Sequence, residues 1–524
     1  MDHEAPRPSK LFVIVVVFLS ATWLTLAVSV VRQQGRYFGS PDETANDVFI
    51  RSLATKASYT YQSSLTPVQL TFLHPRSTFV RGSTLSSGSF ISFTQFGAVI
   101  DRLVGSEAHR YATPLLGLLS LLALFGVFHH FWGRWWSLLG TVLVGAHPAV
   151  FNLYTVPLLQ NGGFTALLVI SGWALLQHHQ APSLKFAVRF AILYGLAIFM
   201  RPVELLWTGP AIAVVLLTMS QGWRWFLVIV GIAGLMQTPW LVADAQQFGS
   251  ALTSGYTPEG LVDSSAQSQT VLSPLFRLLT PVGGRWSWHW LSSVWWYMIM
   301  LIPAWSLAAV MGMAVYFRRK FVDRKKLIKI GFLIVIFCFL GAYYGSWNLY
   351  PATAAARVGF AASYVRYWLP LYVAMGAGFI VFLRVFRPWP KLLLITLVTV
   401  VLSGQVYEVW SHPVSGIKRR LDQAAMAKST MNTVWPFIPA NAIVVAGQDD
   451  KWFWPSRTTS YDLPHDPKGW TIVREALASH TLFLYVVPGQ FPSPNWTKDV
   501  PLYGLRARVV RQIGTDTLWQ IEAI

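Results

Sequence analysis

The feature that most constrains the fold is a series of apolar runs, each about 20 residues long, which is the length of helix needed to cross a bilayer core of about 30 Å. The first run is Leu11–Val31. Later runs lie near 111–131, 135–153, 162–178, 186–201, 203–220, 225–243, 290–317, 327–347, 364–386 and 390–409. Together they predict a mainly α-helical, polytopic membrane protein with about eleven transmembrane helices.

Composition and charge agree with this class. The chain is 54% hydrophobic and 12% charged, whereas soluble domains carry about 25% charged residues. A net charge of +19 would indicate nucleic-acid binding if it lay on one soluble face. Much of it lies in short loops between apolar runs, so we predict no nucleic-acid partner. The single Cys338 excludes an intrachain disulfide framework and a multi-thiolate metal site.

Basic residues also predict the orientation. The first run is longer than a signal-peptide core and lacks a small-residue cleavage site, so we expect a retained helix with a cytoplasmic N-terminus. Threading the runs from that start places short, basic loops inside, most clearly 318–329, as the positive-inside rule requires. The segments 32–110, 243–289, 346–363 and everything after about 410 then lie on the non-cytoplasmic side. We therefore expect an integral multi-pass protein of the plasma or inner membrane.

Two domains are predicted. Residues 1–409 form the transmembrane domain, with interfacial helices in the first outer loop, 32–110. Residues 410–524 form a small α/β domain outside the membrane, because a helical pattern at 416–432 precedes β-like runs separated by Pro, Gly and Asp turns. These runs are Ala442–Ala446, Leu482–Val487, Leu505–Ile513 and Leu518–Ile524.

The stretch 40–47 has the form of a helix start. Ser40 is a capping residue, Pro41 suits the first helical position and Glu43 completes a capping box. An apolar stripe then predicts a short amphipathic helix on the membrane surface; it comprises Ala45, Val48, Phe49, Leu53 and Ala57. One interpretation is that Asp42 and Glu43 only stabilise the helix start through the helix dipole. The other is that Asp42 is a catalytic base at the membrane surface, and the local pattern leaves both open.

Several motifs carry a resemblance to a known family. A first transmembrane helix followed by an Asp-Glu pair, in a polytopic chain whose long loops share one side, resembles the GT-C superfamily of membrane glycosyltransferases. The similarity is to the protein O-mannosyltransferase and aminoarabinose-transferase-like branch. Further stretches similar to that branch are His74-Pro75, Phe248–Tyr256, Ser363–Pro370 and Lys451–Arg457.

This resemblance implies an enzyme that moves a hexosyl- or pentosyl-type sugar from a polyprenyl-phosphate carrier to a protein, lipid or glycan acceptor on the non-cytoplasmic side. It implies Asp42 as the base with Glu43 beside it, and His74, Tyr256 and Tyr367 near the substrate. Many relatives carry another acid near the second outer loop, but residues 150–165 contain none. We therefore assign no metal ligands and no cofactor; a divalent metal has no support in the sequence.

Such a reaction needs few groups, because a lipid-linked phosphate is already a good leaving group. A base for the acceptor hydroxyl and cations for the phosphate suffice, and one displacement inverts the anomeric centre. Arg366 is the first candidate cation because it opens a helix on the outer side. The others are Arg201, Arg285, Arg357, Lys451 and Arg457. The alternative for each is an interfacial cation that snorkels to the headgroups, and Glu204 is a candidate ion-pair partner of Arg201.

Two other classes remain open. A transporter or flippase of lipid-linked glycans would place ionisable residues near the bilayer midplane and often show internal repeats. The apolar runs here are almost free of ionisable residues and no repeat is visible. A catalytically silent scaffold would tolerate the loss of Asp42.

Overall fold

The computed structural model describes residues 9–219, 222–251, 288–320, 324–346, 359–360, 363–385, 387, 390–464, 466–488 and 500–524. Within these ranges the chain forms two compact units. Unit 1 is drawn from Met1–Val31, Arg110–Thr238 and Ser268–Arg419, and unit 2 from Arg32–His109, Pro239–Gln267 and Arg420–Ile524. Each unit is described separately below.

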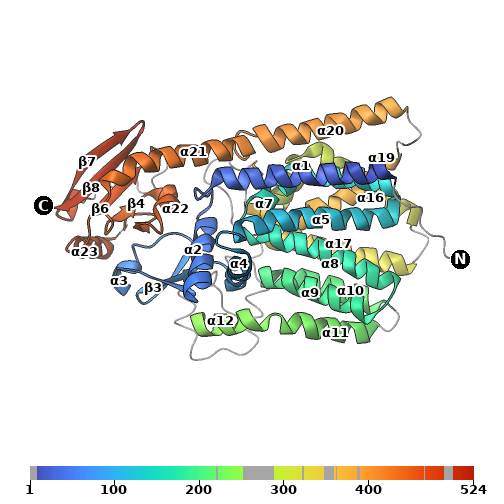
Figure 1. Cartoon of the computed structure of the whole chain (residues 1–524), viewed down its shortest axis with the longest axis horizontal. Coiled ribbons are helices and arrows are strands. Elements are labelled where there is room, and N and C mark those ends of the chain that lie inside the picture. The colour runs from blue at the N-terminus through green and yellow to red at the C-terminus, as the bar shows by residue number, and fades with distance from the viewer. Residues whose placement is uncertain are drawn as a thin grey trace. The chain divides into compact units, whose positions relative to one another are not determined.

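Unit 1 is helical, and Figure 1 shows most of its helices running roughly side by side. The apolar runs of the sequence form these helices because a helix satisfies its own backbone hydrogen bonds, which a bilayer cannot do. The elements are α1 (Lys10–Gln34), α5 (His109–Trp132), α6 (Arg134–Gly145), α7 (Pro148–Thr155), α8 (Gln160–Gln180), α9 (Leu184–Met200), η1 (Pro202–Glu204), α10 (Leu205–Leu217), α11 (Gly222–Leu235), α15 (His289–Ser293), η2 (Val294–Met300), α16 (Pro303–Lys320), α17 (Arg324–Gly345), α18 (Ser363–Tyr367), α19 (Leu369–Val385) and α20 (Lys391–Ser411). Helix α12 (Thr238–Phe248) follows α11 and belongs to unit 2 from Pro239 onward.

Several of these helices are long and apolar enough to cross a membrane. Among the described residues, α1, α5 and α20 meet that requirement singly. Three bent pairs meet it together: α6 with α7, α11 with α12, and the α15–η2 helix with α16. Shorter apolar helices lie at Pro202–Leu217, Ile334–Gly345 and Leu369–Val385. The prediction of several membrane-spanning helices is supported, and the count of about eleven stays a prediction.

The first half of unit 2 is the segment between α1 and α5. It contains α2 (Pro41–Lys56), β1 (Thr60–Gln62), α3 (Pro67–Leu70), β2 (Thr78–Arg81), β3 (Thr84–Ser87) and α4 (Ile91–Val104). The three short strands form an antiparallel sheet in the order β1-β3-β2. Helices α2 and α4 pack together, and Gly97 makes room for Ile50, whose side chain would lie 2.5 Å from a Cβ at that position.

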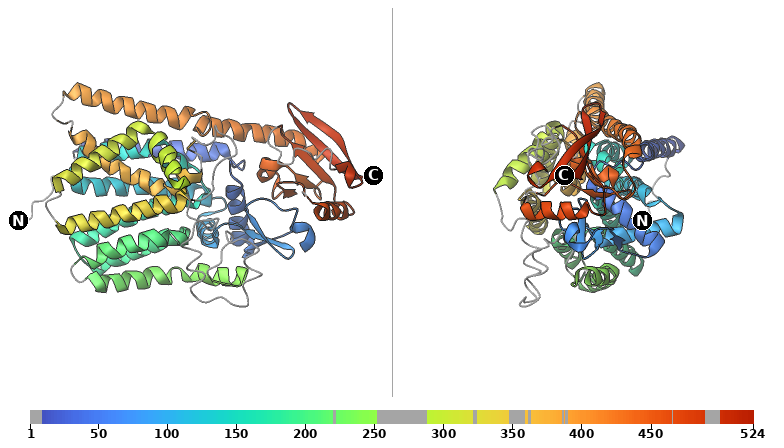
Figure 2. Two further views of the ribbon diagram at one scale, coloured as in Figure 1. Left: turned by 180° about the vertical axis from the view of Figure 1, so that it is seen from behind. Right: turned by 90° about the vertical axis from the view of Figure 1, so that its left-hand side faces the viewer.

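The second half of unit 2 follows α21 (Ile417–Val434) and is built on a five-stranded sheet, seen in red and orange in Figure 2. Its elements are η4 (Trp435–Phe437), β4 (Ile443–Val445), η5 (Gly447–Asp449), α22 (Asp450–Phe453), β5 (Thr458–Ser460), α23 (Pro467–Ala476), β6 (Leu482–Val486), β7 (Leu505–Ile513) and β8 (Asp516–Ala523). The strand order is β5-β4-β6-β8-β7, with β4 parallel to β5 and β6, and β8 antiparallel to β6 and β7. All four predicted β-like runs are strands here.

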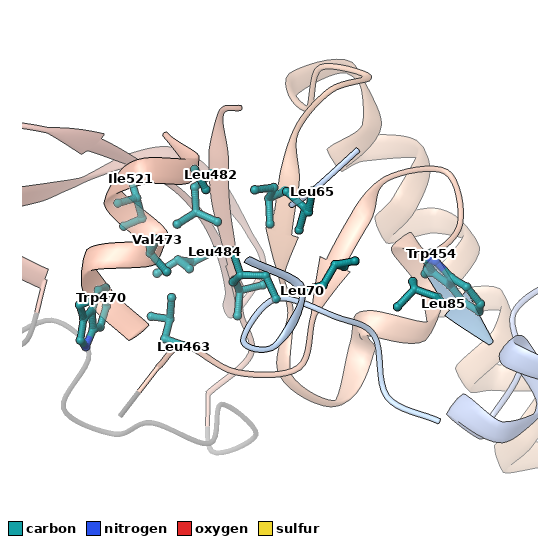
Figure 3. Close-up of a cluster of buried hydrophobic side chains, with 14 of the residues drawn as sticks. Leu65, Leu70, Leu85, Trp454, Leu463, Trp470, Val473, Leu482, Leu484 and Ile521 are labelled. Atoms are coloured by element: carbon teal, nitrogen blue, oxygen red, sulfur yellow. The ribbon is translucent and has the colours of Figure 1, made fainter. Parts of the chain in front are cut away.

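One hydrophobic core joins the two halves of unit 2. Leu65 and Leu70 from the first half lie in the same buried cluster as Leu482, Leu484 and Ile521 from the five-stranded sheet (Figure 3). All of them are at most 2% exposed. The first outer loop and the C-terminal sheet therefore fold as one body.

The sequence predicts α2 as an amphipathic surface helix, and the structure differs from this prediction in the burial of its polar side chains. The apolar stripe is buried as expected up to Leu53, but the helix ends at Lys56, so Ala57 is exposed. Two residues outside the apolar stripe are buried too, since Asn46 and Asp47 are 0% and 7% exposed. Burial of Asp47 is supported by Arg51 at 2.9 Å and by the His109 ring at 3.0 Å, since buried charges need partners.

Candidate active site

Helix α2 begins as its sequence predicts. Ser40 is the N-cap, its Oγ accepts the Asp42 backbone N–H at 3.2 Å, and Pro41 is the first helical residue. Glu43 completes the capping box, because its Oε2 accepts the Ser40 backbone N–H at 3.2 Å. The helix start thus places two adjacent carboxylates in one turn, and their surroundings differ.

The Glu43 side chain is buried, with 3% of the residue exposed. Burial raises the pKa of Glu43 to about 7, although the nearby Arg420 guanidinium pulls it down. Burial likewise lowers the pKa of Arg420 to about 10, which leaves it charged at neutral pH. Glu43 is therefore a capping and packing group that holds a proton near neutrality.

Asp42 is half-buried and is contacted by the turn that follows α3. The Ser77 hydroxyl donates to Asp42 Oδ1 at 2.5 Å. His74 and Thr78 close this turn: Thr78 Oγ1 donates to the Pro75 carbonyl at 2.6 Å, and His74 Nδ1 lies 3.4 Å from Thr78 Oγ1. His74 therefore lies in the turn whose Ser77 contacts the candidate base.

An ion pair fastens the same turn to the C-terminal half of unit 2. Arg76 donates to Asp450 three times: from its backbone N at 2.9 Å, from Nε at 3.1 Å and from Nη2 at 2.6 Å. Asp450 is 0% exposed. A buried carboxylate held by one Arg in this way fixes the turn, because loss of either partner would leave a buried charge uncompensated.

Lys451 follows Asp450 and also reaches α2, since its backbone carbonyl accepts the Thr44 hydroxyl at 3.3 Å. Its ammonium donates to the Gln448 carbonyl at 2.5 Å and lies 3.7 Å from Asp449. Burial lowers the pKa of Lys451, opposed by that carboxylate. Lys451 is thus a largely buried cation on the segment that packs against α2.

Arg457 makes different contacts. Its Nε and Nη2 donate to the Ile438 carbonyl at 3.3 and 2.7 Å, and its guanidinium lies 4.8 Å from the centre of the Trp435 ring. Two hydrogen bonds to one carbonyl fix its position in unit 2.

In unit 1, two predicted cations, Arg201 and Arg366, both lie near the ring of the predicted substrate-pocket residue Tyr367. The guanidinium of Arg201 lies 4.9 Å, and that of Arg366 5.2 Å, from the centre of the Tyr367 ring. Arg201 also forms the anticipated ion pair with Glu204 at 2.8 Å, and the Tyr344 hydroxyl donates to the same carboxylate at 2.6 Å. Glu204 therefore balances the charge of Arg201.

Tyr256, Arg285 and Arg357 lie outside the described residues. In the described part of the chain, no group of three or more His, Cys, Asp or Glu residues could hold a metal ion. The sequence did not indicate Ser77, Arg76 or Asp450, since no local pattern marks a contact between such distant segments.

Comparison with known proteins identifies the fold. No family model and no curated protein matches the chain. Among solved structures, ArnT from Cupriavidus metallidurans bound to undecaprenyl phosphate is similar at 13% identity, with a TM-score of 0.55 and 98% of each chain covered. Its apo state matches at 12% identity and a TM-score of 0.55 over 97% of each chain.

A second protein has a related fold. The archaeal oligosaccharyltransferase AglB from Archaeoglobus fulgidus, in complex with an inhibitory peptide and a dolichol-phosphate, matches at 8% identity with a TM-score of 0.50. The match covers 89% of this chain and 69% of that one. The fold of this chain is therefore similar to the folds of ArnT and AglB.

Proposed function

We propose that this chain is an integral membrane glycosyltransferase that moves a sugar from a polyprenyl-phosphate carrier to an acceptor on the non-cytoplasmic side, with Asp42 as the base. Its fold is similar over nearly its whole length to that of ArnT bound to undecaprenyl phosphate. The observation that carries the proposal is the half-exposed Asp42 carboxylate at the start of α2, held by Ser77.

The surroundings of the two acids favour Asp42 over Glu43. Glu43 is 3% exposed and already occupied by the capping box, so an acceptor hydroxyl has no access to it. Burial raises the pKa of Glu43 to about 7, which leaves it only partly ionised at neutral pH. Acid–base roles are commonly divided between neighbouring carboxyls by such differences in environment. Asp42 is the member of the pair that an acceptor hydroxyl can reach.

The proposed reaction is a single displacement. Asp42 accepts the proton of the acceptor hydroxyl, the hydroxyl oxygen attacks the anomeric carbon, and the bond to the carrier phosphate breaks with inversion. Cations then stabilise the departing phosphate. Arg366 is our first candidate, ahead of Arg201, whose charge Glu204 already balances. The further candidates are Lys451, Arg457 and Arg357.

The orientation follows from the basic loops. With a cytoplasmic N-terminus, the first outer loop with Asp42 and the C-terminal sheet lie on the non-cytoplasmic side. Labelling of cysteines introduced at exposed positions tests this, with a membrane-impermeant reagent on intact cells. Asp422, exposed on α21, suits an outer-side position, and Lys391, exposed at the start of α20, suits an inner one.

The decisive assay incubates purified protein with a panel of polyprenyl-phosphate hexoses and pentoses and candidate acceptors. We expect release of free polyprenyl phosphate together with a glycosylated acceptor. Asp42→Asn should abolish formation of both products. The matched control is Asp422→Asn, at an exposed aspartate of the same unit, and it should leave the formation of both products unchanged. Movement of intact donor across proteoliposomes, without release of polyprenyl phosphate, would instead establish the flippase alternative.

A further inference from the structure

Ser77 has an unusual backbone conformation. Its φ is +59°, in the left-handed region, and it is one of three non-glycine residues in the described ranges with positive φ. This region costs an L-residue roughly 1–2 kcal/mol, and glycine or asparagine normally occupies it. A serine here therefore indicates that the side chain has a use.

The neighbouring chain enforces this conformation. Gly88 N–H donates to the Ser77 carbonyl at 2.9 Å. A Cβ at Gly88 would lie 2.7 Å from the Ser77 carbonyl carbon, so the chain just after β3 approaches the turn as closely as a glycine permits. On the other side, Arg76 fixes the turn to the buried Asp450.

The hydroxyl of Ser77 serves Asp42 and not its own turn. Its hydrogen bond within the described residues is the one to Asp42 Oδ1 at 2.5 Å. The bonds that close the turn come from Thr78 and the His74 ring. The turn can therefore keep its shape when the hydroxyl is removed.

We propose that Ser77 is the positioning residue of the catalytic base, an inference that rests on the proposed function. Its hydroxyl donates to one oxygen of the Asp42 carboxylate and fixes the plane of that carboxylate relative to α2. A base held in one orientation is presented to the acceptor hydroxyl more often in a productive geometry. The same hydrogen bond favours the ionised form of the carboxylate. Arg76 and Asp450 act one step further away, by fixing the turn.

The test compares two variants that both lack the hydroxyl but differ in the strain of the left-handed backbone conformation. Ser77→Gly removes the hydroxyl and relieves the left-handed strain, whereas Ser77→Ala removes the hydroxyl and keeps the strain. If the hydroxyl matters, both variants lose roughly tenfold to a hundredfold in kcat, the range expected for a hydrogen bond to a charged group. The KM for the donor should change less than about threefold, since positioning acts on the chemical step. The acid limb of the kcat/KM profile should move to higher pH.

The control is Ser83→Ala in the same loop. Ser83 accepts a hydrogen bond from exposed Gln62 at 3.1 Å, and its loss should leave kcat and the pH profile unchanged. Wild-type kcat and an unmoved acid limb in Ser77→Gly would overturn the inference, because a purely conformational role is filled at least as well by glycine.

A second readout needs no turnover. Infrared difference spectra, with Asp42→Asn as the reference, follow ionisation of the Asp42 carboxylate during a pH titration. Ser77→Gly should move the midpoint up by about one pH unit, and an unchanged midpoint would overturn the inference. This result stands even if no donor is turned over, so failure of the inference is distinguishable from failure of the proposed function.

Discussion

Replacing Glu43 by Gln should stabilise the protein above neutral pH. Glutamine occupies the same volume and also serves in a capping box, so the substitution mainly removes the ionisable group. The Glu43 pKa is raised from 4.5 to about 7, with burial as the largest cause and Arg420 opposing it. In the wild type, ionised Glu43 therefore destabilises the folded state.

The sign and size follow from proton linkage. The folded state binds the Glu43 proton more tightly than the unfolded chain does, so the free energy of unfolding falls as pH rises from 4.5 to about 7. Above that range the loss is complete, and at 1.36 kcal/mol per pH unit it amounts to about 3 kcal/mol. Below pH 4.5 both states are protonated and the group contributes nothing.

The assay is thermal unfolding in detergent at about pH 5 and about pH 8.5, for the wild type and Glu43→Gln. We expect a Tm only about 2–3 °C higher for the variant at the lower pH and about 6–12 °C higher at the upper pH, using the scaling for a body of 150–250 residues. The matched control is Glu475→Gln, at an exposed glutamate on α23, and its Tm should differ from that of the wild type by the same amount at both pH values. A variant less stable than the wild type at the upper pH would refute the reasoning, because ionised Glu43 would then be a net stabilising partner of Arg420.

Three further substitutions test the packing around the site. Gly88→Ala places a Cβ 2.7 Å from the Ser77 carbonyl carbon and should cost about 1–3 kcal/mol, with faster hydrogen exchange in β2; unchanged exchange would contradict it. Leu484→Ala, 0% exposed in the shared core, should cost about 2–5 kcal/mol and weaken hydrogen-exchange protection in both β6 and α3, whereas loss confined to β6 would argue for separate cores. Glu204→Gln leaves Arg201 without its 2.8 Å ion pair, and should lower the unfolding free energy by about 3–5 kcal/mol; an unchanged Tm would show that other groups balance Arg201.

The features predicted correctly from the sequence are those set by neighbouring residues. The start of α2 follows from Ser40, Pro41 and Glu43, and β7 follows from a run of β-forming residues between turns. The ion pair of Arg201 with Glu204 was anticipated because the two lie three residues apart.

The features that were missed depend on contacts between distant segments. The amphipathic pattern of α2 could not reveal that Asp47 is buried, since its partner His109 lies on another helix. The environments of Asp42 and Glu43 are likewise set by Ser77 and Arg420. No local pattern reports such contacts, and the sequence could therefore propose the acid pair without assigning a role to each member.

The most direct test of the central claim is a single-turnover measurement with saturating polyprenyl-phosphate sugar and an accepted acceptor. Asp42→Asn keeps the shape of the side chain and removes the base. We expect donor binding within about threefold of the wild type and a transfer rate lower by roughly 10²–10⁴-fold, the usual contribution of a positioned general base. A transfer rate close to that of the wild type would contradict the assignment of Asp42 as the base of a glycosyltransferase.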